Sequence, residues 1–193
     1  GRVHDAERID FLHRYLLAPL LGCAVGLATV PVMGQTNVKA AGYYEDALVR
    51  YDKKDIPGAI IQLKNALQID PNMLPVQLLL GKALMENGEV LAAEVALKEA
   101  LRLGVNRAEV AVLLGQSYMA QGKHNLVLDD KVFNPVGLPG GIQLQMFLLR
   151  AKVLADLGKP DLAVRAIEEA RAIDDREVDV WLTEIPIRIR AHE

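Results

Sequence analysis

The sequence predicts an all-α protein built from stacked helix–turn–helix repeats. The triplet Leu79–Gly81 recurs as Leu113–Gly115, so its glycines lie 34 residues apart. A second glycine follows seven residues after each, at Gly88 and Gly122. A fixed period of this length indicates a repeat architecture, in which each unit buries its apolar face against its neighbours.

Composition supports helices and excludes some classes of function. Of the 193 residues, 51% are hydrophobic but only 5% are aromatic, which suits closely packed helices better than a β-sandwich. The net charge of −3 argues against a nucleic-acid-binding protein, which usually carries a basic patch. The single cysteine cannot form a disulfide within the chain.

Residues 1–39 are expected to be an N-terminal export signal or membrane anchor with a short linker. Arg2, Arg8 and Arg14 precede an uncharged, apolar segment at residues 15–33. A basic start followed by an apolar segment is typical of a secretory signal, because the apolar part enters the membrane while the basic flank stays in the cytoplasm.

Several fates are open for this segment. Cleavage after Gly34 would release a soluble exported protein. The string Leu20–Cys23 resembles a bacterial lipobox, in which Cys23 is lipidated. An uncleaved segment could anchor the chain in the membrane. These three predict a protein on the periplasmic side of the envelope; the remaining alternative is a buried helix with an ordinary core cysteine.

The repeat frame divides the rest of the chain into four units and part of a fifth. The units are expected near residues 40–73, 74–107, 108–143 and 144–177, with a partial unit at 178–193. The second helix of the third unit is degenerate, and residues 134–141 form a loop because Pro and Gly are too frequent there for a helix.

From about residue 40 onward the chain resembles the tetratricopeptide repeat (TPR) superfamily. Within it, residues 43–72, 113–130 and 148–170 resemble the TPR lipoproteins of bacterial PEP-CTERM/exosortase systems. The resemblance implies a right-handed α-solenoid behind an N-terminal export signal. It also implies a link to exopolysaccharide and protein-sorting loci of Gram-negative bacteria.

The resemblance further implies a concave groove lined by the first helix of each unit. In such arrays, positions two, five, nine, twelve and thirteen of that helix face inward. Carried onto this chain, the candidate partner-binding residues are Tyr44, Leu48, Tyr51, Leu78, Lys82, Met85, Glu86, Val112, Gln116, Met119, Leu148 and Lys152. Apolar residues with isolated charges suit the binding of a peptide or helix.

No pattern in the sequence indicates catalysis, a metal site or a cofactor. The four histidines are dispersed, and Asp129/Asp130, Glu168/Glu169 and Asp174/Asp175 are adjacent pairs that diverge on a helix and are expected to be solvated. The residues therefore favour a non-enzymatic scaffold for protein–protein interaction. One alternative is a saccharide-associated assembly factor, although Tyr44, Tyr51 and Phe147 are few aromatic side chains for stacking on sugars. Another is a structural segment of a longer TPR superhelix.

Overall fold

The computed structural model describes residues 32–192, and their side chains from residue 36 onward. Residues 1–31 of the predicted export signal, with the candidate lipidation site Cys23, lie outside the described residues. Among the helices that are described, none combines the length and the apolar character needed to cross a bilayer.

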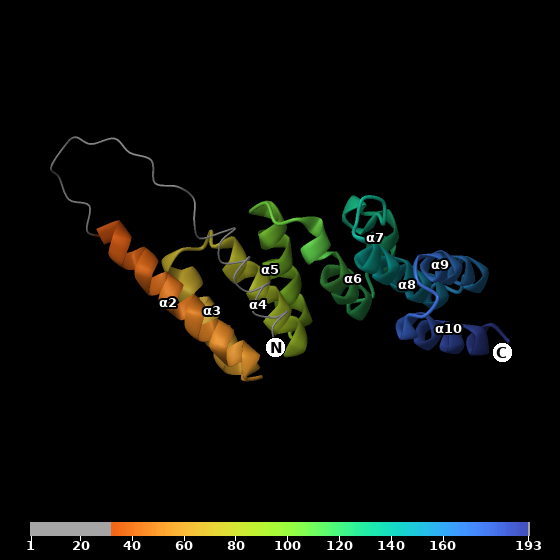
Figure 1. The fold of residues 1–193 in the computed structure, drawn as a ribbon, viewed down its shortest axis with the longest axis horizontal. Helices are drawn as coiled ribbons and strands as arrows, with labels where there is room; N and C mark the ends of the chain where they lie inside the picture. Colours follow the sequence, from red (N-terminus) through yellow and green to blue (C-terminus); the bar gives the residue numbers. More distant parts are fainter. Residues whose placement is uncertain (1–31, 193) are drawn as a thin grey trace.

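The described chain is an array of helices that follow one another along the long axis of the molecule (Figure 1). Helices α2 and α3, α4 and α5, and α8 and α9 form packed pairs, and α10 follows at the C-terminal end. All regular structure in residues 32–192 is helical, so the predicted all-α solenoid of repeats is confirmed. The helices are α2 (Val32–Asp52), α3 (Ile56–Ile69), α4 (Leu74–Glu86), α5 (Val90–Arg102), α6 (Ala111–Ala120), α7 (His124–Asp129), α8 (Gly140–Asp156), α9 (Pro160–Ile173) and α10 (Val178–Ala191), with short 3₁₀ turns η1 (Arg107–Glu109) and η2 (Lys131–Phe133).

The same backbone turn ends the first helix of all four complete units. Position fifteen of the repeat has positive φ in each: 65° at Lys54, 78° at Gly88, 73° at Gly122 and 71° at Gly158. The next N–H then donates to the carbonyl five residues back, as from Glu89 to Leu84 at 2.9 Å. Glycine suits this left-handed position because it has no Cβ to collide with the backbone, so its recurrence follows from the turn.

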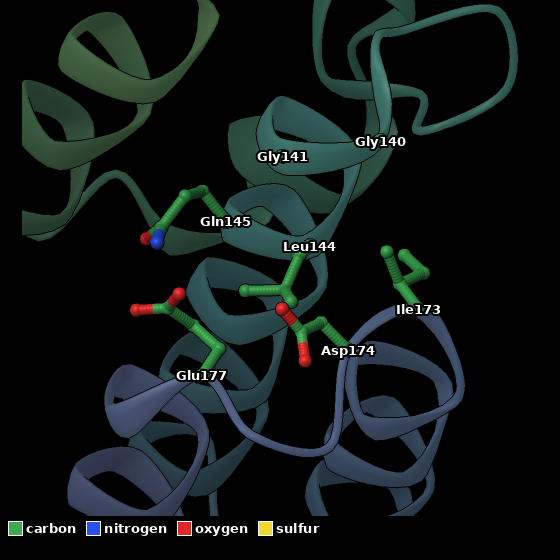
Figure 2. A pocket seen from close by; sticks show the side chains of 7 residues that line it. All are labelled: Gly140, Gly141, Leu144, Gln145, Ile173, Asp174 and Glu177. Atoms are coloured by element: carbon green, nitrogen blue, oxygen red, sulfur yellow. The ribbon is translucent and has the colours of Figure 1, made fainter.

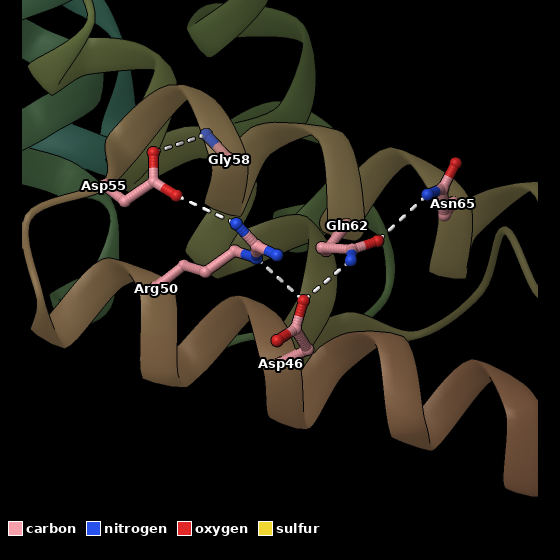
Figure 3. Close-up of polar contacts among 6 residues, drawn as sticks. All are labelled: Asp46, Arg50, Asp55, Gly58, Gln62 and Asn65. Carbon is pink, nitrogen blue, oxygen red and sulfur yellow. Dashed lines mark hydrogen bonds and ion pairs between the residues drawn. The ribbon is translucent and has the colours of Figure 1, made fainter.

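A polar network fixes the first helix pair (Figure 3). Asp55 caps α3 by accepting a hydrogen bond from the Gly58 N–H at 3.1 Å. Arg50 donates to Asp55 at 3.0 Å and to Asp46 at 2.8 Å, and Gln62 of α3 donates to Asp46 at 2.6 Å. The carboxylate of Asp46 thus joins α2 to α3, and the hydrogen bonds from Arg50 and Gln62 lower its pKa.

Small residues at position eight allow the helices to approach closely. This position is occupied by Ala47, Gly81, Gly115 and Ala151, and all four are buried. A Cβ atom on Gly81 would lie 2.5 Å from Leu97 Cδ2 of α5. The repeated glycine in the sequence therefore marks a helix contact with no room for a side chain.

The third unit departs from the pattern, as the sequence indicates. Its second helix, α7, has only six residues. The side chain of Phe133 is buried beyond it and meets the ring of Tyr118 edge to face, with ring centroids 5.7 Å apart. Arg107 holds the following loop by donating to the carbonyls of Val132 at 3.0 Å and Asn134 at 2.6 Å.

Two element boundaries differ from the sequence-based expectation. Helix α2 begins at Val32 rather than near residue 40, because the repeat length predicts where a unit starts but not how far its first helix extends before that point. No proline interrupts the extra residues. Helix α8 begins at Gly140, so Gly140 and Gly141 belong to its first turn instead of the loop expected at 134–141. Pro139 directly precedes that turn.

Candidate binding groove

Three of the predicted groove residues are buried between units. Tyr44 shares a hydrophobic cluster with Leu79 and Leu80 of α4, and Leu78 shares another with residues of α6. Leu148 lies in a third cluster, together with residues of α10. In these three units, position five therefore packs one first helix against the next, and we correct the prediction that these three side chains face a partner.

Position twelve gives a more regular surface. Tyr51, Met85 and Met119 occupy this position in three successive units, 34 residues apart, and all three are half-buried. Each packs on a core cluster with part of its side chain and leaves the rest exposed. Half-buried Leu48 and Val112 are also among the predicted groove residues. We call these five residues the groove strip: Leu48, Tyr51, Met85, Val112 and Met119.

Polar groups accompany the groove strip and link neighbouring units. The Tyr51 hydroxyl donates a hydrogen bond to Glu86 of the second unit. Lys82 Nζ lies 3.9 Å from Glu109 Oε2 of the third unit. The remaining predicted groove residues, Gln116 and Lys152, are exposed.

Electrostatics keep the groove tyrosine neutral. Burial raises the pKa of Tyr51, and its hydrogen bond to Glu86 raises it further. The phenol therefore stays protonated at neutral pH and acts as a donor. Burial also raises the pKa of Tyr44, which, as a core residue, offers no platform for stacking a sugar. Of the three aromatic residues considered for saccharide binding, only Tyr51 and the half-buried Phe147 remain candidates.

A separate pocket of about 360 Å³ lies where α8, α9 and α10 meet (Figure 2). Gly140, Gly141 and Leu144 line it from α8, while Asp174 and Glu177 lie on the connection between α9 and α10. Asp174 and Glu177 make the rim of the pocket acidic, and the side-chain amide of Gln145 also lines it. The repeat frame could have indicated Gln145, because it occupies position two of the fourth unit; nothing in the sequence indicated that Asp174 and Glu177 border a cavity. The described residues hold no cluster of three or more metal-ligating side chains.

Comparison with known proteins identifies the repeats. A family model described as "Tetratricopeptide repeat" matches residues 40–116. The first two complete units and the start of α6 therefore match the tetratricopeptide repeat model. No curated protein matches the chain by sequence.

Solved structures extend the TPR fold over most of the chain. YrrB, described as a TPR protein with an unusual peptide-binding site, is similar with a TM-score of 0.65 and 16% identity over 83% of this chain and 81% of YrrB. The protein MamA gives a TM-score of 0.63 and 21% identity over 76% of this chain and 84% of MamA. PilF of Pseudomonas aeruginosa gives a TM-score of 0.60 and 17% identity over 82% of this chain and 71% of PilF. At these identities the likeness shows a shared fold.

Proposed function

We propose that this TPR chain is a non-catalytic scaffold that binds an apolar peptide or helical segment of a partner protein along the groove strip. The observation that carries the proposal is the recurrence of Tyr51, Met85 and Met119 at position twelve, each half-buried on its own first helix. A segment lying across these helices would meet one apolar side chain per unit. The peptide-binding site described for the similar fold of YrrB supports this proposal.

The chemistry of the strip suits adaptable recognition of apolar side chains. Methionine is flexible and polarizable, so Met85 and Met119 can adjust to different apolar shapes. Lys82, Glu86 and Gln116 lie at neighbouring groove positions and can orient the backbone or polar groups of a bound segment. The strip stands on packed helices, so little ordering entropy is lost on binding.

A selection from displayed random twelve-residue peptides tests the groove. We expect the 193-residue chain to enrich peptides rich in apolar residues. Met85→Glu and Met119→Glu should each weaken binding of an enriched peptide about tenfold or more, because each places a charge where an apolar side chain docks.

Leu91→Glu is the matched control, because Leu91 is an exposed apolar residue on α5, outside the groove strip. It should leave the affinity within about twofold. Failure to enrich any peptide, or equal losses in all three variants, would overturn the proposed groove.

We also propose that the scaffold works in the bacterial cell envelope, in association with a PEP-CTERM protein-sorting and exopolysaccharide system. The basic start, the apolar segment at 15–33 and the resemblance described above support this location. Intact mass after expression in a Gram-negative host tests it, with Cys23→Ala as control. Acyl mass on a chain starting at Cys23, absent from the control, would identify a lipoprotein, and a chain starting at Gln35 would identify a soluble exported form. A chain that keeps its leader and stays in the cytoplasm would overturn the location.

A further inference from the structure

Helix α10 carries an apolar stripe that is about half exposed or more along its length. Successive residues on a helix are turned by about 100°, so the stripe lies on one face while Val180, Thr183 and Ile187 are buried on the opposite face. Its five side chains are between 49% and 62% exposed. The α10 stripe consists of Val178, Trp181, Leu182, Ile185 and Ile189.

The stripe does not match the surface on which a repeat helix packs elsewhere in the array. Ile185 occupies position eight, where the four preceding units place only alanine or glycine. At Gly81 even one added carbon would lie 2.5 Å from the facing helix. A helix on α10 must therefore pack at a wider spacing, with large side chains interdigitating across the contact.

Charges at the two ends of α10 indicate which helix could pack on the stripe. Glu177 and Asp179 lie at its start, and Arg188 and Arg190 lie in its last turn. On the helical wheel Asp179 and Arg190 flank one side of the stripe, while Glu177 and Arg188 flank the other. In an antiparallel pair of identical helices the same flanks meet, so each acidic end would lie beside the basic end of its mate.

Trp181 is already held in place for such a contact. The guanidinium carbon of Arg171 lies 4.9 Å from the centre of its indole ring. Arg171 is fixed in turn by Glu184, which also accepts a hydrogen bond from Arg188 at 2.6 Å. A large aromatic side chain held in this way loses little entropy on burial, as is typical of residues that anchor interfaces.

We propose that the α10 stripe docks a second copy of this chain, with the two α10 helices antiparallel about a two-fold axis near Ile185. A two-fold contact requires a surface that complements itself, and an apolar stripe between oppositely charged ends does so. In this arrangement Ile185 faces its counterpart and Trp181 faces Ile189 of the second copy. The dimer uses a surface distinct from the groove strip and does not rest on the proposed peptide binding.

Sedimentation equilibrium of the 193-residue chain tests the dimer. We expect a species of twice 21.1 kDa, and Ile185→Glu should raise its dissociation constant about tenfold or more, because it places two like charges on the axis. Leu91→Glu on α5 should leave the dimer unchanged. A monomer up to about 100 µM would overturn the proposal. So would a dimer that Ile185→Glu does not weaken, because the association would then lie elsewhere.

Oxidative cross-linking tests the orientation, in a Cys23→Ala background. Ile185→Cys should form a disulfide between copies, because residue 185 lies on the axis. Val178→Cys should not, since an antiparallel pair separates the two residues 178 by about 21 Å, beyond the reach of a disulfide. Equally fast cross-linking of both variants would contradict the antiparallel arrangement.

Discussion

A single backbone position shows how the repeat constrains its residues. Position fifteen is glycine in three complete units, but in the first unit Lys54 holds the same left-handed conformation at φ 65°. A side chain in this region costs about 1–2 kcal/mol relative to glycine. Replacing the side chain by glycine would remove this cost. Glycine also raises the conformational entropy of the unfolded chain, which offsets part of the stability gained.

We therefore expect Lys54→Gly to raise the free energy of unfolding by about 1 kcal/mol, measured by urea denaturation. The loss of the Lys54 contact with the Tyr51 ring, at 5.9 Å, should be minor. Lys53→Gly is the control: its φ is not positive, so glycine there should lower the stability. A Lys54→Gly variant no more stable than the parent would contradict this reading of the turn.

Glu94 gives the structure a pH-dependent contact. It is buried on α5 and accepts hydrogen bonds from Gln121 at 2.8 Å and from Lys123 at 3.0 Å. Burial alone would raise the pKa of this carboxyl, but the hydrogen bonds and the charges of Lys123 and Lys98 outweigh burial and lower it. The pKa of the Glu94 carboxyl is thus lower in the folded chain than in the unfolded chain. Its contribution to the free energy of unfolding is complete above about pH 4.3 and is lost as the pH falls through the folded pKa.

Glu94→Gln should accordingly lower the free energy of unfolding by about 1–3 kcal/mol at pH 7. The difference from the parent should shrink as the pH falls below about 4.3, where the Glu94 carboxyl of the unfolded parent becomes protonated, and it should be lost once the folded carboxyl is protonated as well. Denaturant titrations at several pH values measure this difference in the free energy of unfolding, and Glu169→Gln, which changes an exposed residue, is the control. A difference that stays constant down to pH 3 would show that Glu94 does not titrate as described.

At the scale of elements, the third unit replaces most of a helix with an anchored loop. Besides Val132 and Asn134, Arg107 donates to the carbonyl of Val136 at 2.5 Å. Gln143 of α8 donates to the carbonyl of Pro135 at 3.2 Å. The loop is thus tied both to the preceding turn and to the next helix, which keeps the units on either side in register despite the short α7.

Removing this anchor should make the loop accessible. We expect thermolysin to cut Arg107→Ala within residues 134–139 several times faster than the parent chain, because local opening exposes the backbone. Mass spectrometry of the fragments would locate the cut. Arg165→Ala, which changes an exposed arginine on α9, should be cut at the parental rate. Equal rates for the two variants would mean that Arg107 does not hold the loop.

The sequence predicted the elements better than it predicted the groove. Gly81 and Gly88 are identifiable because close approach and positive φ each restrict a position to very few residue types. Tyr44 was misjudged because the same residue type suits a wet groove and a core, and only the packing of α4 against α2 decides between them. The start of α2 and the first turn of α8 escaped prediction although Pro31 and Pro139 directly precede them. The repeat length placed the first boundary near residue 40, and Gly140 and Gly141 are residue types that are more frequent in loops.

On the scale of the whole molecule, the array offers two surfaces with separate tasks. The groove strip lies on α2, α4 and α6, and the α10 stripe lies at the C-terminal end of the array (Figure 1). A dimer formed through α10 would leave the groove strip of both copies open. Two linked grooves would bind a partner with repeated segments more tightly than one, because the second contact becomes intramolecular.

The groove is tested most directly by methionine-methyl NMR of the 193-residue chain with a selected peptide. The chain contains five methionines; Met85 and Met119 lie in the groove strip, while Met146 is buried in the core. The account predicts that the methyl signals of Met85 and Met119 shift with peptide concentration and that the signal of Met146 stays in place. Saturable binding that leaves both groove methyls unchanged would contradict it.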